Sequence, residues 1–129
     1  RTGEPSPTTV LLMAAARRDF FLTVQHGQFY QGKPVIGYDL PGFGDELCGL
    51  PYLPRLIAKA RAKLVGSMGD DIIYCCENDR RFFRDHGNIH PADFLRVVWA
   101  AGDSDPKGYD YVRQRTLSVS SAVPDNEQT

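Results

Sequence analysis

The chain has 129 residues, of which 42% are hydrophobic and 24% charged, a composition typical of one folded globular domain. Fifteen Lys and Arg balance sixteen Asp and Glu, so the net charge of −1 gives no reason to expect nucleic acid or an anionic membrane as a partner. The longest apolar run, residues 10–16, is far shorter than the roughly 20 residues that cross a bilayer. Three cysteines, two of them adjacent, are a poor disulfide framework and indicate reduced thiols in a cytoplasmic protein.

The first element expected is a helix that follows a flexible tail. Residues 1–9 are rich in Pro, Ser and Thr, which is typical of a terminal tail. Apolar residues at three- and four-residue spacing then predict a helix from Val10 to Val24, capped by Thr8 or Thr9. The alternative for the end of this segment, from Phe20 on, is a short strand, because aromatic and β-branched residues crowd there.

A long Gly- and Pro-rich loop, residues 27–49, comes next, with a possible brief strand at residues 35–36. The clearest helix in the sequence then runs from Leu53 to Leu64, with Pro54 in its first turn and Gly66 as its C-cap. Its sequence separates an apolar stripe from a polar side. The stripe is Leu53, Leu56, Ile57, Ala60 and Leu64, and the opposite side holds Arg55, Lys59, Ala62 and Lys63.

The second half predicts one short strand, at residues 71–76, and three further helices. Residues 117–129 are Ser-rich and predict a polar C-terminal tail. The sequence thus predicts a mainly α single domain, residues 10–116, with four or five helices and one or two short strands. The three helices run from a cap at Asn78 or Asp79 to Asp85, from Pro91 to Ala101, and from Pro106 to about Arg115.

Several blocks between Tyr38 and Arg113 resemble a family of small bacterial domains of unknown function. They are residues 49–55 (Gly-Leu-Pro-Tyr-Leu-Pro-Arg), Ile57, residues 59–62 (Lys-Ala-Arg-Ala), Leu64, the turn at residues 66–69, Tyr74-x-Cys76, Asp79 and Phe82-Phe83. The chain departs from the family pattern in two places: Glu77 replaces the usual proline after the cysteine, and Cys75 adds a thiol. The resemblance implies a family and no activity.

The helix at residues 53–64 carries the first candidate binding residues. Arg55, Lys59 and Lys63 recur every four residues, Arg61 lies beside the apolar stripe, and no acidic residue occurs between residues 52 and 65. We expect this basic face to bind phosphate, a carboxylate ligand or an acidic partner surface. The alternative is an ordinary solvated helix face.

The turn before residue 80 carries the candidate catalytic residues, Cys76 and Asp79. Cys76 precedes a predicted helix start, which favours the nucleophilic thiolate, and His86 or His90 would be its base. The alternative is an inert buried thiol. We expect no metal site, because adjacent cysteines on a strand point to opposite faces, and no cofactor.

The leading functional hypothesis is a protein-interaction module, an accessory or small subunit of a larger assembly with another protein chain as its partner. Aromatic residues at predicted loops, Tyr38, Phe43 and Tyr52, are the expected interface anchors. The alternative is a small enzyme or ligand-binding domain for an anionic ligand. Its pocket would lie between the basic helix and residues 74–79, with Cys76 and Asp79 at the rim.

Overall fold

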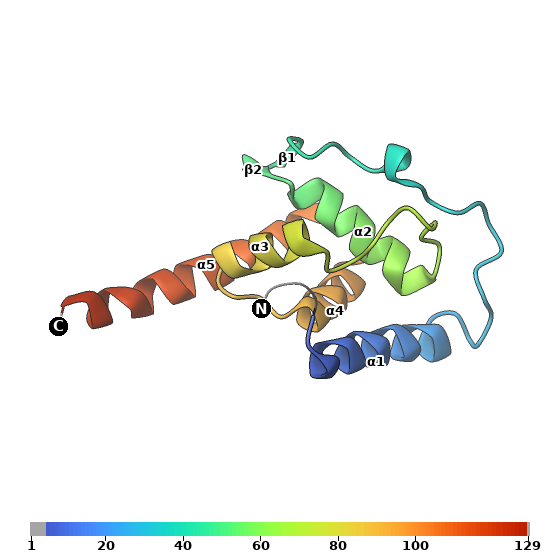
Figure 1. Ribbon diagram of the computed structural model, residues 1–129, viewed down its shortest axis with the longest axis horizontal. Coiled ribbons are helices and arrows are strands. Elements are labelled where there is room, and N and C mark those ends of the chain that lie inside the picture. The colour runs from blue at the N-terminus through green and yellow to red at the C-terminus, as the bar shows by residue number, and fades with distance from the viewer. Residues whose placement is uncertain (1–4, 129) are drawn as a thin grey trace.

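Five α-helices, one short 3-10 helix and one two-stranded hairpin make up the regular structure of the described residues (Figure 1). The computed structural model describes residues 5–128, with the side chains of residues 5–118. The mainly α fold predicted from the sequence is confirmed. In chain order the elements are α1 (Pro7–Thr23), η1 (Gly37–Asp39), β1 (Glu46–Leu47), β2 (Leu50–Pro51), α2 (Leu53–Val65), α3 (Glu77–Asp85), α4 (Pro91–Ala101) and α5 (Asp105–Gln128).

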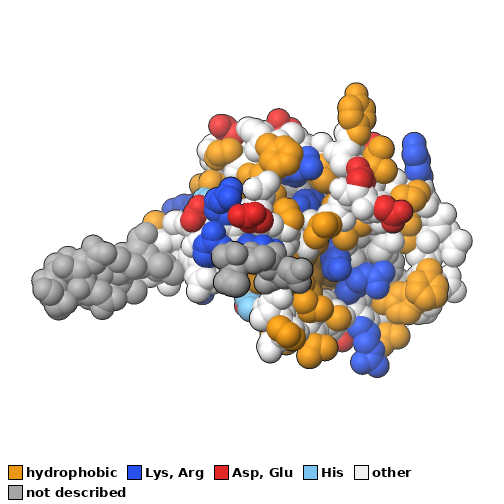
Figure 2. Space-filling model, in the orientation of Figure 1, with side chains coloured by type: hydrophobic (Ala, Val, Ile, Leu, Met, Phe, Trp, Pro, Cys, Tyr) orange, Lys and Arg blue, Asp and Glu red, His pale blue; other side chains and the backbone are white. Residues whose placement is uncertain are grey.

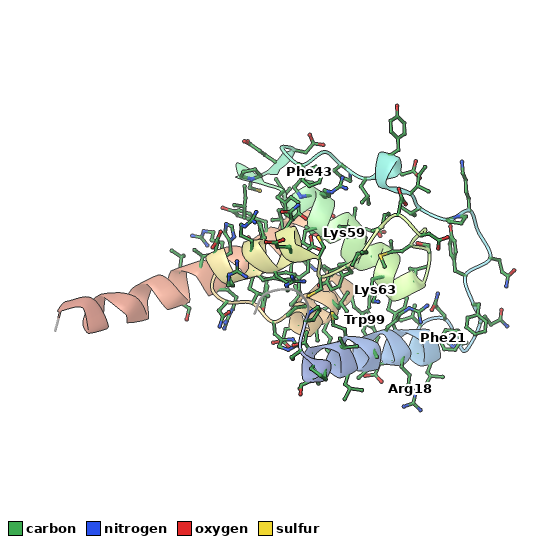
Figure 3. All side chains as sticks on the ribbon, in the orientation of Figure 1. Arg18, Phe21, Phe43, Lys59, Lys63 and Trp99 are labelled. Carbon is green, nitrogen blue, oxygen red and sulfur yellow. The ribbon has the colours of Figure 1, made fainter. Side chains whose placement is uncertain are left out.

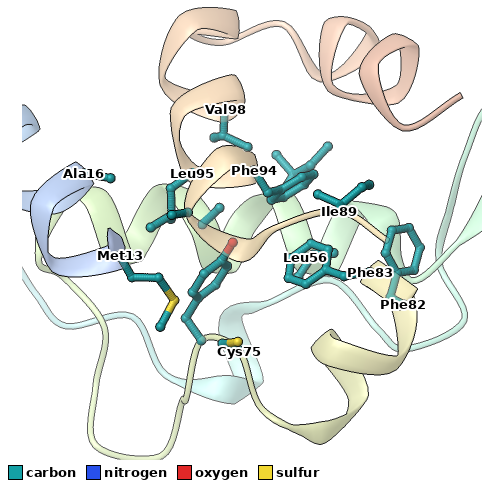
Figure 4. Packing of buried hydrophobic residues seen from close by; sticks show 14 of the residues in the cluster. Met13, Ala16, Leu56, Cys75, Phe82, Phe83, Ile89, Phe94, Leu95 and Val98 are labelled. Carbon is teal, nitrogen blue, oxygen red and sulfur yellow. The ribbon is translucent and has the colours of Figure 1, made fainter. Parts of the chain in front are cut away.

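Helix α2 is the centre of the core, and all five residues of its predicted apolar stripe are buried. Helices α1, α2 and α4 contact one another, and α5 packs against α2 and α4. Phe94, Leu95 and Val98 of α4 fill the space between these helices, and Met13 and Ala16 enter it from α1 (Figure 4). Fully burying a Leu or Phe side chain contributes about 1.5–3 kcal/mol, so this cluster stabilises the three-helix contact.

The ends of the two central helices follow the sequence signals. Gly66 ends α2 in the left-handed region, with φ of 84°, and donates its N–H to Ala62 O at 2.9 Å. Pro91 and Ala101 bound α4 as predicted, and Gly102 follows it. A residue without a Cβ adopts positive φ with little strain, which is why glycine stops both helices.

Helix α1 begins earlier than its apolar pattern predicts. Ser6, and not Thr8 or Thr9, is the N-cap: its hydroxyl accepts the N–H of Thr9 at 3.1 Å, and Pro7 takes the first helical position. The predicted tail therefore shortens, and residues 1–4 lie outside the described residues. The helix continues without a break to Thr23, so the alternative strand from Phe20 on is wrong.

Helix α5 continues well past the predicted end near Arg115 and reaches Gln128 (Figure 1). The apolar spacing that predicted this helix stops near Arg115, and the helix continues beyond it. Most of the expected polar tail is therefore helical, and Thr129 lies outside the described residues. No helix in the described part of the chain has the length and apolar composition of a membrane span.

The strands differ most from expectation. Residues 71–76 form an irregular loop, because no strand lies beside them to take up their backbone hydrogen bonds. Val35 forms a single parallel bridge with Met68. The hairpin of β1 and β2 was not predicted; its two turn residues, Cys48 and Gly49, both have positive φ, of 53° and 83°. That pair is typical of a tight hairpin turn, but Cys-Gly is a weaker sequence signal than Asn-Gly.

Candidate functional site

A buried ion pair joins α2 to the start of α3. Lys59 Nζ lies 2.8 Å from Asp79 Oδ2, and the two residues are 4% and 0% exposed. The alternative of an ordinary solvated helix face is therefore wrong for Lys59, and Ala62 on the same side of α2 is buried as well. Helical spacing identified the side of α2 opposite its apolar stripe correctly, but α3 and the loop before it cover part of that side.

Asp79 accepts hydrogen bonds through both carboxylate oxygens. Lys59 Nζ and the Cys75 backbone N–H donate to Oδ2, each at 2.8 Å, and the Tyr52 hydroxyl donates to Oδ1. Burial, followed by the hydrogen bond to Asp79, raises the pKa of Tyr52 above its usual range, so the hydroxyl remains a donor. Asp79 is thus enclosed by the protein. The sequence predicted it at the rim of a pocket, and that prediction is wrong.

The turn before α3 gives the two adjacent cysteines different surroundings. Cys75 has a positive φ of 72°, and its side chain lies in the core, where burial raises its pKa to about 11. Cys76 is the N-cap of α3, a position that the sequence assigned to Asn78 or Asp79. It is half-buried, and its Sγ accepts a hydrogen bond from Lys59 Nζ at 3.4 Å.

A pocket of about 200 Å³ lies against this cluster, between α2, the 71–76 loop and the Gly- and Pro-rich loop. Its walls include Phe43, Tyr52, Arg55, Lys59, Asp71 and Cys76. A larger hollow, of about 380 Å³ between the start of α1 and α3, has no lysine in its described lining, and its one thiol is the buried Cys75. In the smaller pocket a thiol, an ammonium and a guanidinium therefore occur together.

Arg55 is held at this pocket by two contacts. Its guanidinium carbon lies 4.2 Å from the centre of the Phe43 ring, a cation–π contact, and Nη1 donates to Pro41 O at 3.0 Å. Figure 3 shows Phe43 near the start of α2 and Lys59 farther along the helix. The contacts use few of the five N–H donors of a guanidinium, so the group keeps donors for a ligand.

The two histidines proposed as bases lie elsewhere. His86 stacks on Phe82 with ring centres 4.1 Å apart, and His90 caps α4 by accepting the N–H of Ala92. Neither lines the pocket, so the basic group next to Cys76 is Lys59. Among the described residues, no three His, Cys, Asp or Glu side chains are grouped to hold a metal ion.

The remaining predicted site residues are dispersed. Arg61 forms an ion pair with Asp105 and donates to Gly102 O at 3.1 Å, and Lys63 lines a different hollow, near α1. The four basic residues of α2 therefore do not form one anion-binding surface. Tyr38 is 95% exposed on η1, Phe43 is 57% exposed, and Tyr52 is half-buried.

No protein-family model, curated protein or solved structure matches the chain. The resemblance to the bacterial family therefore stays a prediction. The motif blocks that suggested it nevertheless include five residues at the site: Tyr52, Arg55, Lys59, Cys76 and Asp79.

Proposed function

We propose that this domain binds a small molecule with an anionic group in the pocket beside Lys59, and that Cys76 is its reactive side chain. The observation that carries the proposal is the position of the Cys76 thiol, 3.4 Å from the Lys59 ammonium in a pocket that also contains Arg55. A thiol beside a cation and at a helix N-terminus is the setting in which cysteines act as nucleophiles.

The buried ion pair supports a role beyond folding. Removing two charges from water is costly, and a pair of apolar side chains of similar volume is often as stable or more stable. The Lys59–Asp79 pair fixes an ammonium beside Cys76, with the Tyr52 hydroxyl and the Cys75 N–H holding the carboxylate in place. An immobile cation stabilises a negative sulfur without reorganisation, which a mobile surface lysine does not.

Arg55 supplies the proposed anion contact. Its stacking on Phe43 restrains the guanidinium, and a restrained guanidinium binds carboxylate or phosphate through two parallel hydrogen bonds. The ligand would therefore place its anionic group at Arg55 and its reacting carbon at Cys76.

Alkylation rates test both parts of this proposal. In a Cys48→Ser background, which removes the exposed thiol, the probes are iodoacetate and iodoacetamide at pH 7; in each case the Cys76 sulfur displaces iodide. We expect Arg55→Gln to lower the ratio of the iodoacetate rate to the iodoacetamide rate at least about fivefold, since the lost contact is worth about 1 kcal/mol or more. We expect Lys59→Met to slow both reagents.

The matched control is Arg113→Gln, an exposed arginine on α5 away from the pocket, which should leave the ratio unchanged. An unchanged ratio in Arg55→Gln would refute the anion site. If Cys76 reacts no faster than a free cysteine in solution, the reactive-thiol assignment is wrong.

The interaction module is the second candidate function, and the exposed apolar residues of α1 favour it. Leu11 and Leu22 are 70% and 52% exposed, on a helix whose other side packs in the core. Exposed apolar side chains grouped on one element mark interaction sites more often than isolated ones do. The test is the mass of the particle isolated gently from native cells: a second chain in fixed ratio supports the module, and a free monomer refutes it.

A further inference from the structure

Helix α1 borders a groove with an apolar floor. A hollow of about 370 Å³ lies between α1, the start of the long loop and the end of α2; we call it the α1 groove. Its apolar lining is Val10, Met13, Ala14, Phe21 and Phe29, and the ring centres of Phe21 and Phe29 lie 4.9 Å apart. Phe29 is 71% exposed, so this apolar surface is open to a partner. Figure 2 shows hydrophobic and basic side chains side by side at this end of the molecule.

The charged side chains that line the groove are all cations: Arg17, Arg18 and Lys63. Figure 3 labels Arg18 on α1 and Lys63 on α2. None of the three forms an ion pair with another described residue; the acid nearest in sequence, Asp19, pairs with Arg96 at 2.8 Å. Arg17 Nε donates instead to the backbone oxygen of Lys63, at 3.0 Å, which brings two positive side chains together.

The crowding of like charges affects Lys63. Burial, followed by the charge of Arg17, lowers the pKa of Lys63 below its usual value. A carboxylate placed in the groove would offset the charge of Arg17 and favour the charged form of Lys63. The groove is therefore complementary to a ligand that is both apolar and acidic.

We propose that the α1 groove binds an acidic, amphipathic helical segment of a partner protein, with Leu or Phe side chains on Phe21 and Phe29 and carboxylates on Arg17, Arg18 and Lys63. This inference rests on the second candidate function, the interaction module, and is independent of the Cys76 pocket. A helical segment fits better than a small amphiphile, because the exposed side chains of Leu11 and Leu22, on the side of α1 next to the groove, widen the apolar surface around this helix. Such helix-in-groove contacts use apolar anchors every three or four residues.

The test uses the whole chain and a fluorescent synthetic peptide of about 18 residues, with Leu or Phe at helical spacing and Glu between them. Binding is measured by anisotropy, with a scrambled peptide of the same composition alongside. We expect Arg18→Glu and Phe29→Ala each to weaken binding about tenfold. Both side chains are exposed, so neither change should unfold the protein. The matched controls, Arg113→Glu and Tyr38→Ala, also change exposed residues and should alter binding less than twofold.

Four outcomes would overturn the inference. Equal binding of the scrambled peptide would reduce the contact to charge alone, and unchanged binding by both groove variants would place the peptide elsewhere. The groove would be a membrane site if the unaltered chain bound anionic phosphatidylserine vesicles and no peptide, and if the groove variants lost the vesicle binding. The particle mass separates the groove proposal from the interaction module. If native particles of the Arg18→Glu/Phe29→Ala variant keep a second chain, the proposal that the α1 groove binds the partner is wrong and the interaction module stands.

Discussion

Asp79 has its carboxylate in the protein interior, where one lysine, one tyrosine and one backbone N–H donate to it. These contacts connect α2 to the turn before α3, so a single residue fixes both the helix start and the position of Cys76. Lys59 is 20 residues away in sequence, and helical spacing alone predicts an exposed side chain there. The pairing follows from the tertiary fold, which buries both charges. A buried charge is costly unless an opposite charge lies beside it, so the lysine and the aspartate must pair.

Breaking the Lys59–Asp79 pair should destabilise the protein more than any surface charge change. We expect Lys59→Met and Asp79→Leu each to lower the free energy of unfolding by about 3–5 kcal/mol, because the remaining charge is left buried and unpaired. The double variant Lys59→Met/Asp79→Leu should recover part of this loss. Urea unfolding measures the free energy of unfolding of all three variants.

The control for this prediction is Arg61→Met, which breaks the partly exposed Arg61–Asp105 pair and should cost about 1 kcal/mol or less. Equal effects of Lys59→Met and Arg61→Met would mean that burial does not strengthen the first pair.

Cys75 should react only when the protein opens. In a Cys48→Ser/Cys76→Ser variant it is the one remaining thiol; it is 1% exposed, and burial raises its pKa to about 11. We expect its rate of modification by iodoacetamide at pH 8 to rise with urea in parallel with the unfolded fraction. Rapid modification without urea would show that the 74–76 turn opens by itself.

At the scale of elements, glycines at helix ends serve two different purposes. Gly66 ends α2, and the atom that a Cβ would meet there belongs to the guanidinium of the Arg17 side chain. Gly87, after α3, has φ of 99° and packs against the backbone of α5: an added Cβ would lie 2.6 Å from Arg115 O. Arg115 Nη2 also donates to Gly87 O, at 2.7 Å, so this contact joins α3 to α5. The sequence has a glycine after each helix, and only the packing distinguishes the two positions.

Gly87→Ala should therefore cost more than Gly66→Ala. Positive φ in a residue with a Cβ costs about 1–3 kcal/mol, and overpacking against rigid backbone adds about 1–3 kcal/mol. We expect about 1–2 kcal/mol for Gly66→Ala and about 2–4 kcal/mol for Gly87→Ala, measured by thermal unfolding. The reverse order would mean that α5 shifts more easily than the Arg17 side chain.

At the scale of the whole molecule, the long loop runs as an open arc around one side of the helices, from the end of α1 to the hairpin (Figure 1). This arc brings Phe43 to one end of α2, whereas Phe29, near the start of the loop, lies beside α1 and Lys63. The Cys76 pocket and the α1 groove thus lie in different parts of the molecule, and each can be altered without the other.

Stability should fall as the pH rises above about 9. Burial raises the pKa of Cys75, to about 11, and also those of Tyr52, Tyr74 and Tyr111. The unfolded chain loses these protons at lower pH than the folded chain does, so the unfolded state binds fewer protons and gains as pH rises. The lowered pKa of Lys63 has the opposite effect and makes stability rise with pH. This single group is outweighed by the four groups whose pKa is raised.

The urea midpoint measured from pH 8 to pH 11 tests this expectation. Cys75→Ala should flatten the early part of the decline, since the unfolded thiol ionises first, near pH 8.5. A midpoint that does not change over this range would show that the buried hydroxyls and thiol do not govern alkaline stability.

Short-range signals predicted much of the fold. The apolar stripe of α2, the limits of α4 and the glycine after each of these helices follow from side-chain spacing and local backbone preference, which neighbouring residues determine. The strand expected at residues 71–76 was wrong because a strand needs a partner that its own sequence does not specify. The end of α5 was missed because the apolar spacing that predicts a helix stops near Arg115, whereas the helix reaches Gln128.

The candidate sites divide in the same way. The sequence by itself determined that α2 is basic, that Cys76 precedes a helix and that the chain folds as a mainly α protein. The tertiary structure decided that Lys59 is buried against Asp79, that Arg61 and Lys63 face different neighbours, and that two arginines of α1 meet Lys63 in one groove. The physical reason is that charges distant in sequence interact only after packing excludes water and brings them within a few ångströms.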